Sequence, residues 1–331
     1  MRTRQVAGRD VSAIGFGCMS LSHAYGSPPP KEDGVRLLQR ALDLGCTFFD
    51  TAALYGFGAN ETLVGEALSH RRSEFLLASK CGIIRGEDGK RRIDGRPASI
   101  QRTCEESLTR LKTEVIDLYY LHRWDKAVPV EESVGALGDL VAQGKVLTIG
   151  LSEVSADTLR RAHAVHPIAA LQSEYSPWTR NPEIATLDAC REIGAAFVAF
   201  SPVGRGFLAG GVKDPAAFAE GDIRRGMPRF QGEHFRKNLD LLPGFFKIAR
   251  DHECTPAQLA LGWVLAQGDH ILPIPGTTRL DHLEEDLAAG DLELDASAMR
   301  QVSELINPQT VSGARYNPAT QAEIDTEELA V

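Results

Sequence analysis

Short apolar runs alternate with longer amphipathic segments along most of the chain, and this alternation restricts the possible folds more than any other feature. Eight apolar runs have the length of β-strands, and each is followed by a segment with apolar residues at helical spacing. The apolar runs cover residues 13–21, 46–51, 75–80, 116–122, 146–152, 169–175, 195–202 and 270–276. The helical segments cover residues 31–45, 61–70, 99–112, 130–144, 155–165, 183–194, 255–268 and 277–289. Repeated strand–helix pairs predict an α/β protein with a parallel sheet.

Such a sheet can close into a (β/α)8 TIM barrel or stay open and doubly wound, and eight strands is the number at which a barrel closes. An open sheet that binds a dinucleotide carries a glycine fingerprint after an early strand. The nearest match here, Gly204-x-Gly206-x-x-Ala209, follows the seventh strand and is weak on its own. The sequence therefore predicts one (β/α)8 TIM barrel domain over residues 1–331, with residues 307–331 as a C-terminal tail near the barrel mouth.

Charge and cysteine content argue against several classes of partner. The chain has 36 Lys and Arg against 45 Asp and Glu, a net charge of −9, which disfavours a nucleic acid or an anionic membrane as partner. The six cysteines are scattered, and the histidine pair His163 and His166 lacks a third ligand, so no metal site is expected. No segment has the length of a membrane span, and the N-terminus lacks the apolar core of a signal peptide. We therefore expect a cytoplasmic protein.

Four titratable residues occur at or just after the ends of three predicted strands, where TIM barrels carry their chemistry. Asp50, Lys80 and His122 end the second, third and fourth strands, and Tyr55 lies in the loop after Asp50. Each has an ordinary alternative: a turn aspartate, a solvated lysine, a hydrogen-bonded core histidine or an aromatic residue of the rim. Their joint occurrence at one end of the barrel favours a shared catalytic site.

The four side chains are suited to proton transfer. Tyrosine has an ordinary pKa of about 10, and the ammonium group of Lys80 favours the phenolate, so we expect it to lower the pKa of Tyr55. Asp50 can keep Lys80 charged and oriented, and a neutral His122 can donate a hydrogen bond to a carbonyl oxygen. Such a site delivers a proton to an oxygen that gains negative charge, as reduction of a carbonyl group requires.

The segments "FFDTAALYG", "LLASK" and "YYLHR" resemble the motifs that carry the Asp, Tyr, Lys and His tetrad of the aldo-keto reductase superfamily. The likeness extends in order from "IGFGCM" to "PIPGTTRLDHLEED". The segments "GLSEVSADTLRRAHAVHPIAALQSEYSPWTR" and "PRFQGEHF" further resemble the branch that includes perakine reductase and auxin-induced-type proteins. The resemblance implies a barrel that uses NADPH to reduce aldehydes or ketones, with Tyr55 as the proton donor.

The resemblance also implies positions that contact NADPH or NADP+. Ser152 and Gln172 match residues that hold the nicotinamide carboxamide, and Phe200 matches the aromatic residue that stacks on the nicotinamide ring. Glu153 stands where the family has Asn, and Asp286 also replaces a usual Asn. The loop after the seventh strand matches the diphosphate site, and the segment that opens the last helix matches the site for the 2′-phosphate and adenine. These two regions contribute Ser201, Val203, Gly204, Arg205, Gly206, Gly276, Thr277, Arg279, Glu285 and Asp286.

Substrate specificity in this fold depends on loops over the mouth. Here these are the segment after Tyr25, the loop of residues 213–238 and the tail of residues 307–321. Trp124 and Trp178 indicate an apolar, partly aromatic pocket that prefers hydrophobic or aromatic aldehydes to sugars. Either tryptophan could instead be a packing residue.

Two functions from different classes fit the resemblance. The first is an NADPH-dependent reductase whose partner is a small-molecule carbonyl substrate. The second is a cofactor-binding regulatory subunit, because potassium-channel β-subunits share the fold and the tetrad. The chain shows no long N-terminal extension and no evident apolar docking face, which favours the enzyme. The sequence leaves the oligomeric state open.

Overall fold

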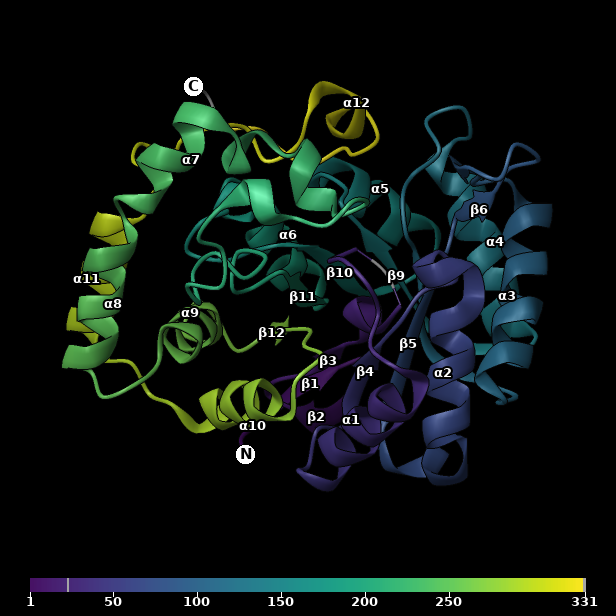
Figure 1. The fold of residues 1–331 in the computed structure, drawn as a ribbon. Helices are drawn as coiled ribbons and strands as arrows, with labels where there is room; N and C mark the ends of the chain where they lie inside the picture. Colours follow the sequence, from purple (N-terminus) through teal and green to yellow (C-terminus); the bar gives the residue numbers. More distant parts are fainter. Residues whose placement is uncertain (23, 330–331) are drawn as a thin grey trace.

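A closed parallel barrel forms the centre of the computed structural model, which describes residues 1–22 and 24–329 (Figure 1). Its strands are β3 (Phe16–Gly17), β4 (Phe48–Asp50), β5 (Leu76–Cys81), β8 (Ile116–Leu121), β9 (Val146–Ser152), β10 (Ile168–Glu174), β11 (Ala196–Phe200) and β12 (Ile271–Ile274). They pair in this order from β3 to β12. The N–H groups of Gly15 and Gly17 donate to the carbonyls of Pro273 and Pro275 at 3.0 and 2.9 Å. These bonds join β3 to β12, and the predicted single-domain (β/α)8 fold is confirmed.

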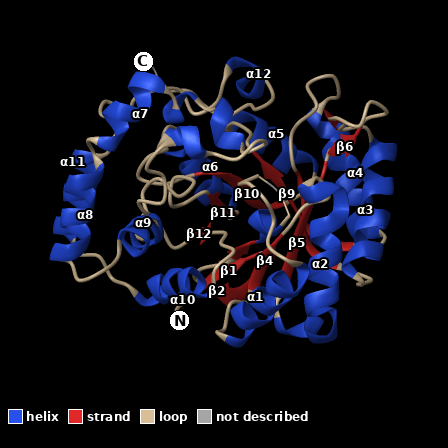
Figure 2. Ribbon diagram, in the orientation of Figure 1, coloured by secondary structure: helices blue, strands red, loops and turns tan. Residues whose placement is uncertain are grey.

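Helices cover the outer face of the barrel, and Figure 2 shows them around the strands. The barrel helices are α1 (Lys31–Asp43), α2 (Ala59–Leu68), α3 (Pro97–Leu111), α4 (Val130–Ala142), α5 (Ala156–Val165), α6 (Thr186–Ile193), α9 (Pro256–Leu265) and α10 (Leu280–Ala288). In α1, Leu37, Leu38 and Ala41 share one buried face, as a helix packed on a sheet requires. No helix of the described residues is long and apolar enough to cross a membrane.

Several further elements surround the barrel. They are the hairpin β1 (Thr3–Val6) and β2 (Arg9–Ser12), the hairpin β6 (Ile83–Arg85) and β7 (Arg91–Ile93), and the helices α7 (Gly232–Leu239), α8 (Leu242–Asp251), α11 (Ala296–Leu305) and α12 (Pro318–Gln321). Val6 and Val11 of the first hairpin pack against Phe48, Leu118 and Leu272 of the barrel interior. This hairpin therefore closes the barrel at the end opposite its mouth.

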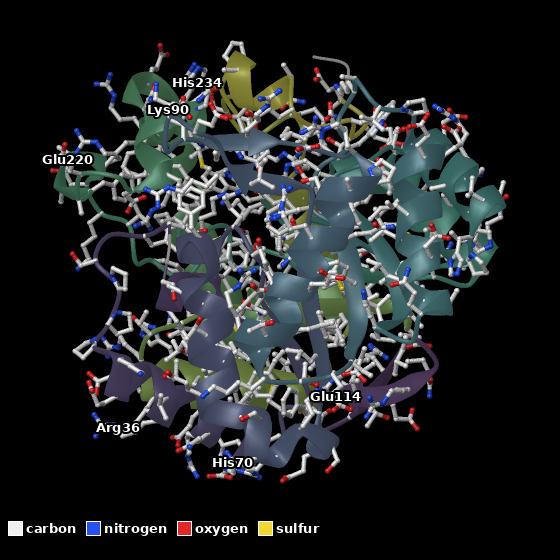
Figure 3. All side chains as sticks on the ribbon, turned by 90° about the vertical axis from the view of Figure 1, so that its right-hand side faces the viewer. Arg36, His70, Lys90, Glu114, Glu220 and His234 are labelled. Carbon is white, nitrogen blue, oxygen red and sulfur yellow. The ribbon has the colours of Figure 1, made fainter. Side chains whose placement is uncertain are left out.

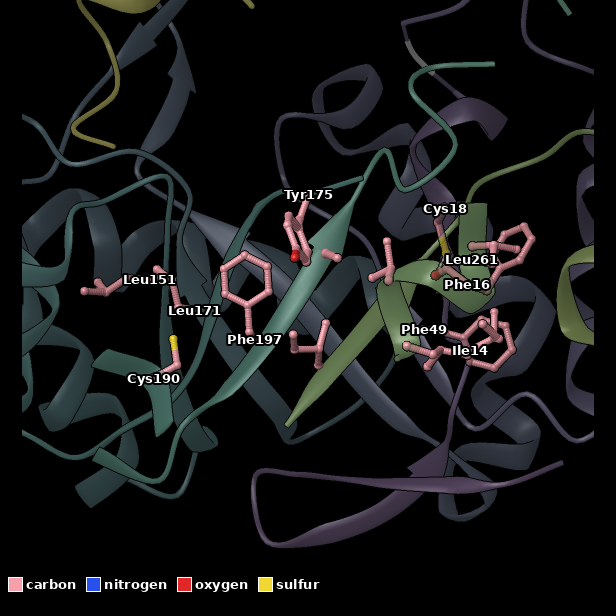
Figure 4. Close-up of a cluster of buried hydrophobic side chains, with 14 of the residues drawn as sticks. Ile14, Phe16, Cys18, Phe49, Leu151, Leu171, Tyr175, Cys190, Phe197 and Leu261 are labelled. Atoms are coloured by element: carbon pink, nitrogen blue, oxygen red, sulfur yellow. Dashed lines mark hydrogen bonds between the residues drawn. The ribbon is translucent and has the colours of Figure 1, made fainter. Parts of the chain in front are cut away.

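The apolar core lies between the sheet and the helices. Figure 4 shows part of it, where Leu171, Tyr175 and Phe197 of the β10–β11 region lie near Cys190 of α6. The ring of Tyr175 meets that of Phe197 edge-on, with centroids 5.8 Å apart. This packing holds β10 and β11 in position, and the carboxyl ends of these strands carry polar residues.

Loops at the carboxyl ends of the strands form the mouth of the barrel. In Figure 3, Lys90 of the β6–β7 hairpin and His234 of α7 lie at one end of the molecule, whereas Arg36, His70 and Glu114 lie at the other. Residues 315–323 of the predicted tail reach the mouth, where Tyr316, Asn317, Thr320 and Glu323 line a cavity. Residues 330 and 331 of that tail lie outside the described residues.

Candidate active site

A cavity of about 1040 Å³ opens at the carboxyl ends of the strands and contains the predicted tetrad at one end. Asp50, Tyr55 and His122 line the cavity, and Lys80 lies behind Asp50 and Tyr55 with a fully buried side chain. Asp50 ends β4 and Lys80 lies near the end of the adjacent parallel strand β5. The strand register therefore brings together side chains that are 30 residues apart in the sequence.

Lys80 is the centre of the hydrogen-bond network. Its Nζ donates to the carboxylate of Asp50, to the carbonyl oxygen of Thr51 at 2.8 Å and to the phenol oxygen of Tyr55 at 3.1 Å. Nε2 of Gln172 donates to the second carboxylate oxygen of Asp50 at 2.7 Å. An ammonium group has three N–H donors, so these three acceptors fix its position.

The charges of this cluster are coupled. Burial alone lowers the pKa of Lys80, but Asp50 and Tyr55 raise it above its ordinary value, so the side chain stays an ammonium. Burial raises the pKa of Asp50, and Lys80 and Gln172 oppose that rise. Burial also raises the pKa of Tyr55, whereas Lys80 lowers it. The expected lowering by Lys80 is therefore present, but burial outweighs it, and the pKa of Tyr55 lies above its ordinary value.

A sharp turn after Tyr55 directs its ring into the cavity. Gly56, Phe57 and Gly58 all have positive φ angles, of 57°, 49° and 95°. Phe57 is the unusual member, since non-glycine residues seldom adopt this left-handed conformation. The side chain of Asn60 holds the start of this loop, because it accepts a hydrogen bond from Thr51 Oγ1 at 2.7 Å and donates to the backbone of the β3 loop.

His122 faces Tyr55 across the catalytic end. The two rings meet edge-on, with centroids 5.7 Å apart and an interplanar angle of 88°. The backbone N–H of His122 donates to the carbonyl of Cys81 at 2.8 Å, which extends the β5–β8 pairing to the histidine. The imidazole and the phenol therefore approach the same volume of the cavity from the ends of β8 and β4, which lie on either side of β5.

Most of the residues predicted to contact NADPH surround the same cavity. Those that line it are Ser152, Gln172, Phe200, Ser201, Val203, Arg205, Gly206, Gly276, Thr277, Arg279, Glu285 and Asp286. A Cβ atom at Gly276 would come within 2.6 Å of the carbonyl oxygen of Gly17, so only glycine lets the chain pass β3 this closely. Gly204 is the exception, because it packs on the ring of Trp178 and does not line the cavity.

The segment around the start of α10 can accommodate an anion. Within the described residues, the N-cap residue Arg279 makes no side-chain capping bond in this nine-residue helix, so N–H groups of its first turn remain for a ligand. Thr277 is buried, and its Oγ1 accepts a hydrogen bond from the N–H of Arg279 at 3.1 Å. Arg279 forms a two-point ion pair with the carboxylate of Asp281, which would compete with a bound phosphate.

Asp286 contributes an unusual carboxyl group to this end of the cavity. Its side chain is buried, and burial together with the nearby charge of Glu285 raises the pKa of Asp286 to about 8. At neutral pH the group is therefore mainly a neutral acid that can donate a hydrogen bond. A protonated carboxyl group offers one donor and one acceptor, as the amide of Asn does.

Arg205 belongs to a buried ion pair rather than to an open phosphate site. Its Nη2 donates to Glu174 at 2.5 Å and to the hydroxyl of Tyr316 at 3.1 Å, and its Nη1 lies 3.3 Å from the hydroxyl of Tyr25. Burial alone lowers the pKa of Arg205, but Glu174 raises it well above its ordinary value. Arg205 thus lines the cavity as predicted, but Glu174 already pairs with the guanidinium that was expected to supply donors to a diphosphate.

Glu153, which stands where Asn was expected, holds the C-terminal tail. Both of its carboxylate oxygens accept hydrogen bonds from Arg315, at 3.1 and 2.6 Å. Its carbonyl oxygen accepts a hydrogen bond from the N–H of Asp325 at 3.0 Å. Glu153 has a positive φ of 58°, a conformation for which Asn is several-fold enriched. Glu153 thus has the backbone conformation that suits Asn at this position. Its side chain is a carboxylate in place of the expected amide, and this carboxylate binds the tail.

The two tryptophans predicted for the substrate pocket do not line the cavity. Trp178 is buried and stacks on Phe207 with ring centroids 4.2 Å apart. The indole N–H of Trp124 turns back to donate to the carbonyl of Val128 at 2.9 Å. Both are packing residues, whereas Tyr25 does line the cavity. The prediction of an aromatic pocket built from these tryptophans is therefore wrong.

Sequence reasoning did not single out several residues of the cavity. Arg123, Arg91 and Tyr316 line it, from the loop after β8, from β7 and from the tail. Arg123 directly follows His122, and this adjacency was the available signal. Tyr316 lies in the tail that was expected near the mouth, although the residue itself was not singled out, and Arg91 comes from a hairpin outside the strand–helix repeat, to which no pattern in the sequence pointed.

The chain is similar to proteins of one known family in both sequence and fold. The model of the aldo/keto reductase family matches residues 13–307. The NADP(+) aldo-keto reductase yakc of Schizosaccharomyces pombe is 45% identical over 328 residues, which cover 97% of this chain and 96% of that protein. A glycerol dehydrogenase of Gluconobacter oxydans superimposes with a TM-score of 0.85 at 28% identity, covering 96% of this chain and 98% of the dehydrogenase. An aldo/keto reductase of Klebsiella pneumoniae in complex with NADP and acetate has a TM-score of 0.72 at 27% identity, with 96% and 99% covered. The chain therefore belongs to the aldo/keto reductase family.

Proposed function

We propose that this protein reduces aldehydes or ketones to alcohols with NADPH, and that Tyr55 donates the proton. Family membership supports the broader statement, an NADP-dependent oxidoreductase that acts on carbonyl groups. The observation that carries the specific assignment is the buried ammonium of Lys80, which contacts Asp50 and the phenol oxygen of Tyr55 at the wall of the cavity. Within the family we place the chain in the branch of perakine reductase and auxin-induced-type proteins, on the segments quoted above.

Each residue of the site has a separate role in protonating the substrate oxygen. NADPH, when bound, supplies a hydride to the carbonyl carbon. The phenol of Tyr55 gives its proton to the carbonyl oxygen, and His122 donates a hydrogen bond to the same oxygen. Lys80 stabilises the phenolate that remains, and Asp50 together with Gln172 holds Lys80 in place. The product is the alcohol, and Tyr55 regains its proton from solvent.

The cavity fits NADPH in size and in the placement of its polar groups. It extends from Ser152 and Gln172 at the tetrad to Thr277 and Arg279 at the uncapped start of α10. The nicotinamide would lie near the first pair, with Phe200 offering a flat aromatic face. The 2′-phosphate would lie at the second pair, where helix N–H groups favour an anion.

The first experiment measures NADPH oxidation with simple aldehydes and ketones and quantifies the alcohol product. The proposal predicts one alcohol formed per NADPH consumed, and no consumption without the carbonyl compound. NADPH binding without turnover across a broad carbonyl panel would instead support the regulatory-subunit alternative.

Arg279→Ala should weaken NADPH binding several-fold to roughly ten-fold and leave NADH binding nearly unchanged, since only NADPH has the 2′-phosphate. Asp281→Asn provides the matched control, because it removes the carboxylate that occupies Arg279. This variant should bind NADPH more tightly than wild type. The measurement is Kd by fluorescence titration for both cofactors. Equal losses for NADPH and NADH in Arg279→Ala would rule out a 2′-phosphate contact.

NADPH affinity should fall as the pH rises through about 8, because the raised pKa of Asp286 keeps this buried group neutral below that pH. Above it, a carboxylate would face the cofactor's phosphate and lose its donor proton. Asp286→Asn should bind NADPH with a flat profile from pH 7 to roughly 9.5, a window above the second pKa of a phosphate monoester at about 6. Identical profiles for wild type and Asp286→Asn would contradict this role.

A further inference from the structure

Arg123 brings a guanidinium group to the catalytic end of the cavity, next to His122. Its Nη1 donates to the carbonyl oxygen of His122 at 2.7 Å and lies 3.4 Å from the hydroxyl of Ser152. Its Nε is buried and has no hydrogen-bond partner among the described residues. The contacts of Nη1 hold the side chain in place, and the N–H groups of Nη2, which make no hydrogen bond within the described residues, remain for a ligand.

The other charged side chains at this end of the cavity are already paired. The pairs are Lys80 with Asp50 and Arg91 with Glu323. Within residues 1–22 and 24–329, no carboxylate lies within ion-pair distance of Arg123. Because the neighbouring charges cancel in pairs, Arg123 gives this end of the cavity a net positive charge. A partly buried charge without a counter-ion is unfavourable, and an anionic ligand would neutralise it.

The anionic groups of the cofactor are expected on the other side of the mouth. Arg123 follows β8, whereas the residues assigned to the diphosphate and the 2′-phosphate follow β11 and β12. In the sheet, β9 and β10 separate β8 from β11. The anion that meets Arg123 must therefore belong to the second ligand of the cavity, and the neighbouring Tyr55 and His122 identify that ligand as the carbonyl substrate.

We propose that Arg123 selects carbonyl substrates that carry a carboxylate a few bonds from the carbonyl group, the class of short oxo acids. The inference rests on the proposed reductase function and adds the substrate class to it. A guanidinium fork matches the two oxygens of a carboxylate and forms charge-assisted hydrogen bonds with them. The contact also fixes the distance from the anion to the reacting carbon, because Arg123 is adjacent to a tetrad residue in the chain.

The test compares 4-oxobutanoate with its uncharged methyl ester as substrates, at saturating NADPH. The readout is the ratio of the two kcat/KM values within each variant, so a general loss of activity cancels. The variants are wild type, Arg123→Gln, Arg123→Lys and Arg85→Gln. Arg85 is the matched control, because it lies in the β6–β7 hairpin, carries the same charge and does not line the cavity.

Wild type should favour the acid over the ester by roughly 10- to 100-fold, the range for a hydrogen bond between charged groups. Arg123→Gln should lose most of this preference, mainly through a higher KM for the acid. Arg123→Lys should keep part of it, and Arg85→Gln should match wild type. Reduction of both compounds without preference, or a wild-type ratio in Arg123→Gln, would overturn the role of Arg123 and leave the reductase function intact.

The absence of any NADPH-dependent reduction in wild type would instead refute the proposed function itself, and with it this role. Inhibition of the wild-type enzyme tests the role of Arg123 without a variant. Butanoate should compete with an uncharged aldehyde at least about 10-fold better than butanamide, since only butanoate offers the anion. Equal inhibition by the two compounds would contradict the proposal.

Discussion

Tyr55→Phe should lower kcat for carbonyl reduction by about 10²- to 10⁴-fold, the usual contribution of a positioned proton donor. The variant removes one oxygen atom, and with it the hydrogen bond from Lys80 at 3.1 Å. The ring keeps its edge-on contact with His122 and its place in the cavity wall. The dissociation constant for NADPH and the thermal unfolding temperature should therefore stay close to wild type.

Tyr316→Phe serves as the control for this variant. Tyr316 also lines the cavity, and its hydroxyl accepts a hydrogen bond from Arg205 at 3.1 Å, but it does not contact Lys80 in the structure. Loss of the Tyr316 hydroxyl should lower kcat by less than about ten-fold. A decrease of that size is smaller than the usual contribution of a proton donor. Full turnover in Tyr55→Phe would remove Tyr55 from the mechanism.

Lys80→Met should lower kcat/KM for reduction by roughly 10²-fold or more, because the phenolate that forms at Tyr55 loses its stabilising ammonium. The same variant should change the pH dependence of alcohol oxidation, which requires the phenolate. Burial already holds the pKa of Tyr55 above its ordinary value against the effect of Lys80, and without Lys80 it rises further. Oxidation should therefore begin to increase at higher pH in Lys80→Met than in wild type.

A structural loss must be separated from this electrostatic effect. Lys80→Met leaves Asp50 buried without its counter-ion, and breaking a buried pair costs about 3–5 kcal/mol of stability. The double variant Lys80→Met with Asp50→Asn removes both charges and should recover part of the lost stability but none of the activity. Recovery of activity along with stability would show that Lys80 only maintains the fold.

The barrel could be predicted from the sequence because its signal is local and repeated eight times. Each amphipathic helix must bury one face, and each apolar strand must bury two, so the alternation leaves few arrangements. The position of the tetrad followed from the fold, since parallel strands end at a common mouth. Asp50 and Lys80 could therefore be placed together before any contact was known.

The side chains of the loops could not be predicted in the same way. Trp178 was expected to face the substrate, but it stacks on Phe207, a partner that no local pattern identifies. Arg205 was expected to supply donors to a diphosphate, and the sequence did not indicate that its guanidinium pairs with the buried carboxylate of Glu174. In both cases the direction of the side chain depends on a tertiary partner far away in the sequence. The net shift in the pKa of Tyr55 could not be predicted for a related reason. The shift depends on how deeply the phenol is buried, and this depth is a property of the folded chain.

A double-mutant cycle on Tyr55 and Lys80 tests the central claim, that Lys80 acts through the phenol of Tyr55. The measurement is kcat/KM for reduction of one aldehyde by wild type, Tyr55→Phe, Lys80→Met and the double variant, at saturating NADPH. Residues that act as a unit are strongly non-additive. The double variant should therefore be about as active as the slower single variant. Losses that multiply, so that the double variant is slower by the product of the two single effects, would contradict the coupling of Lys80 to Tyr55.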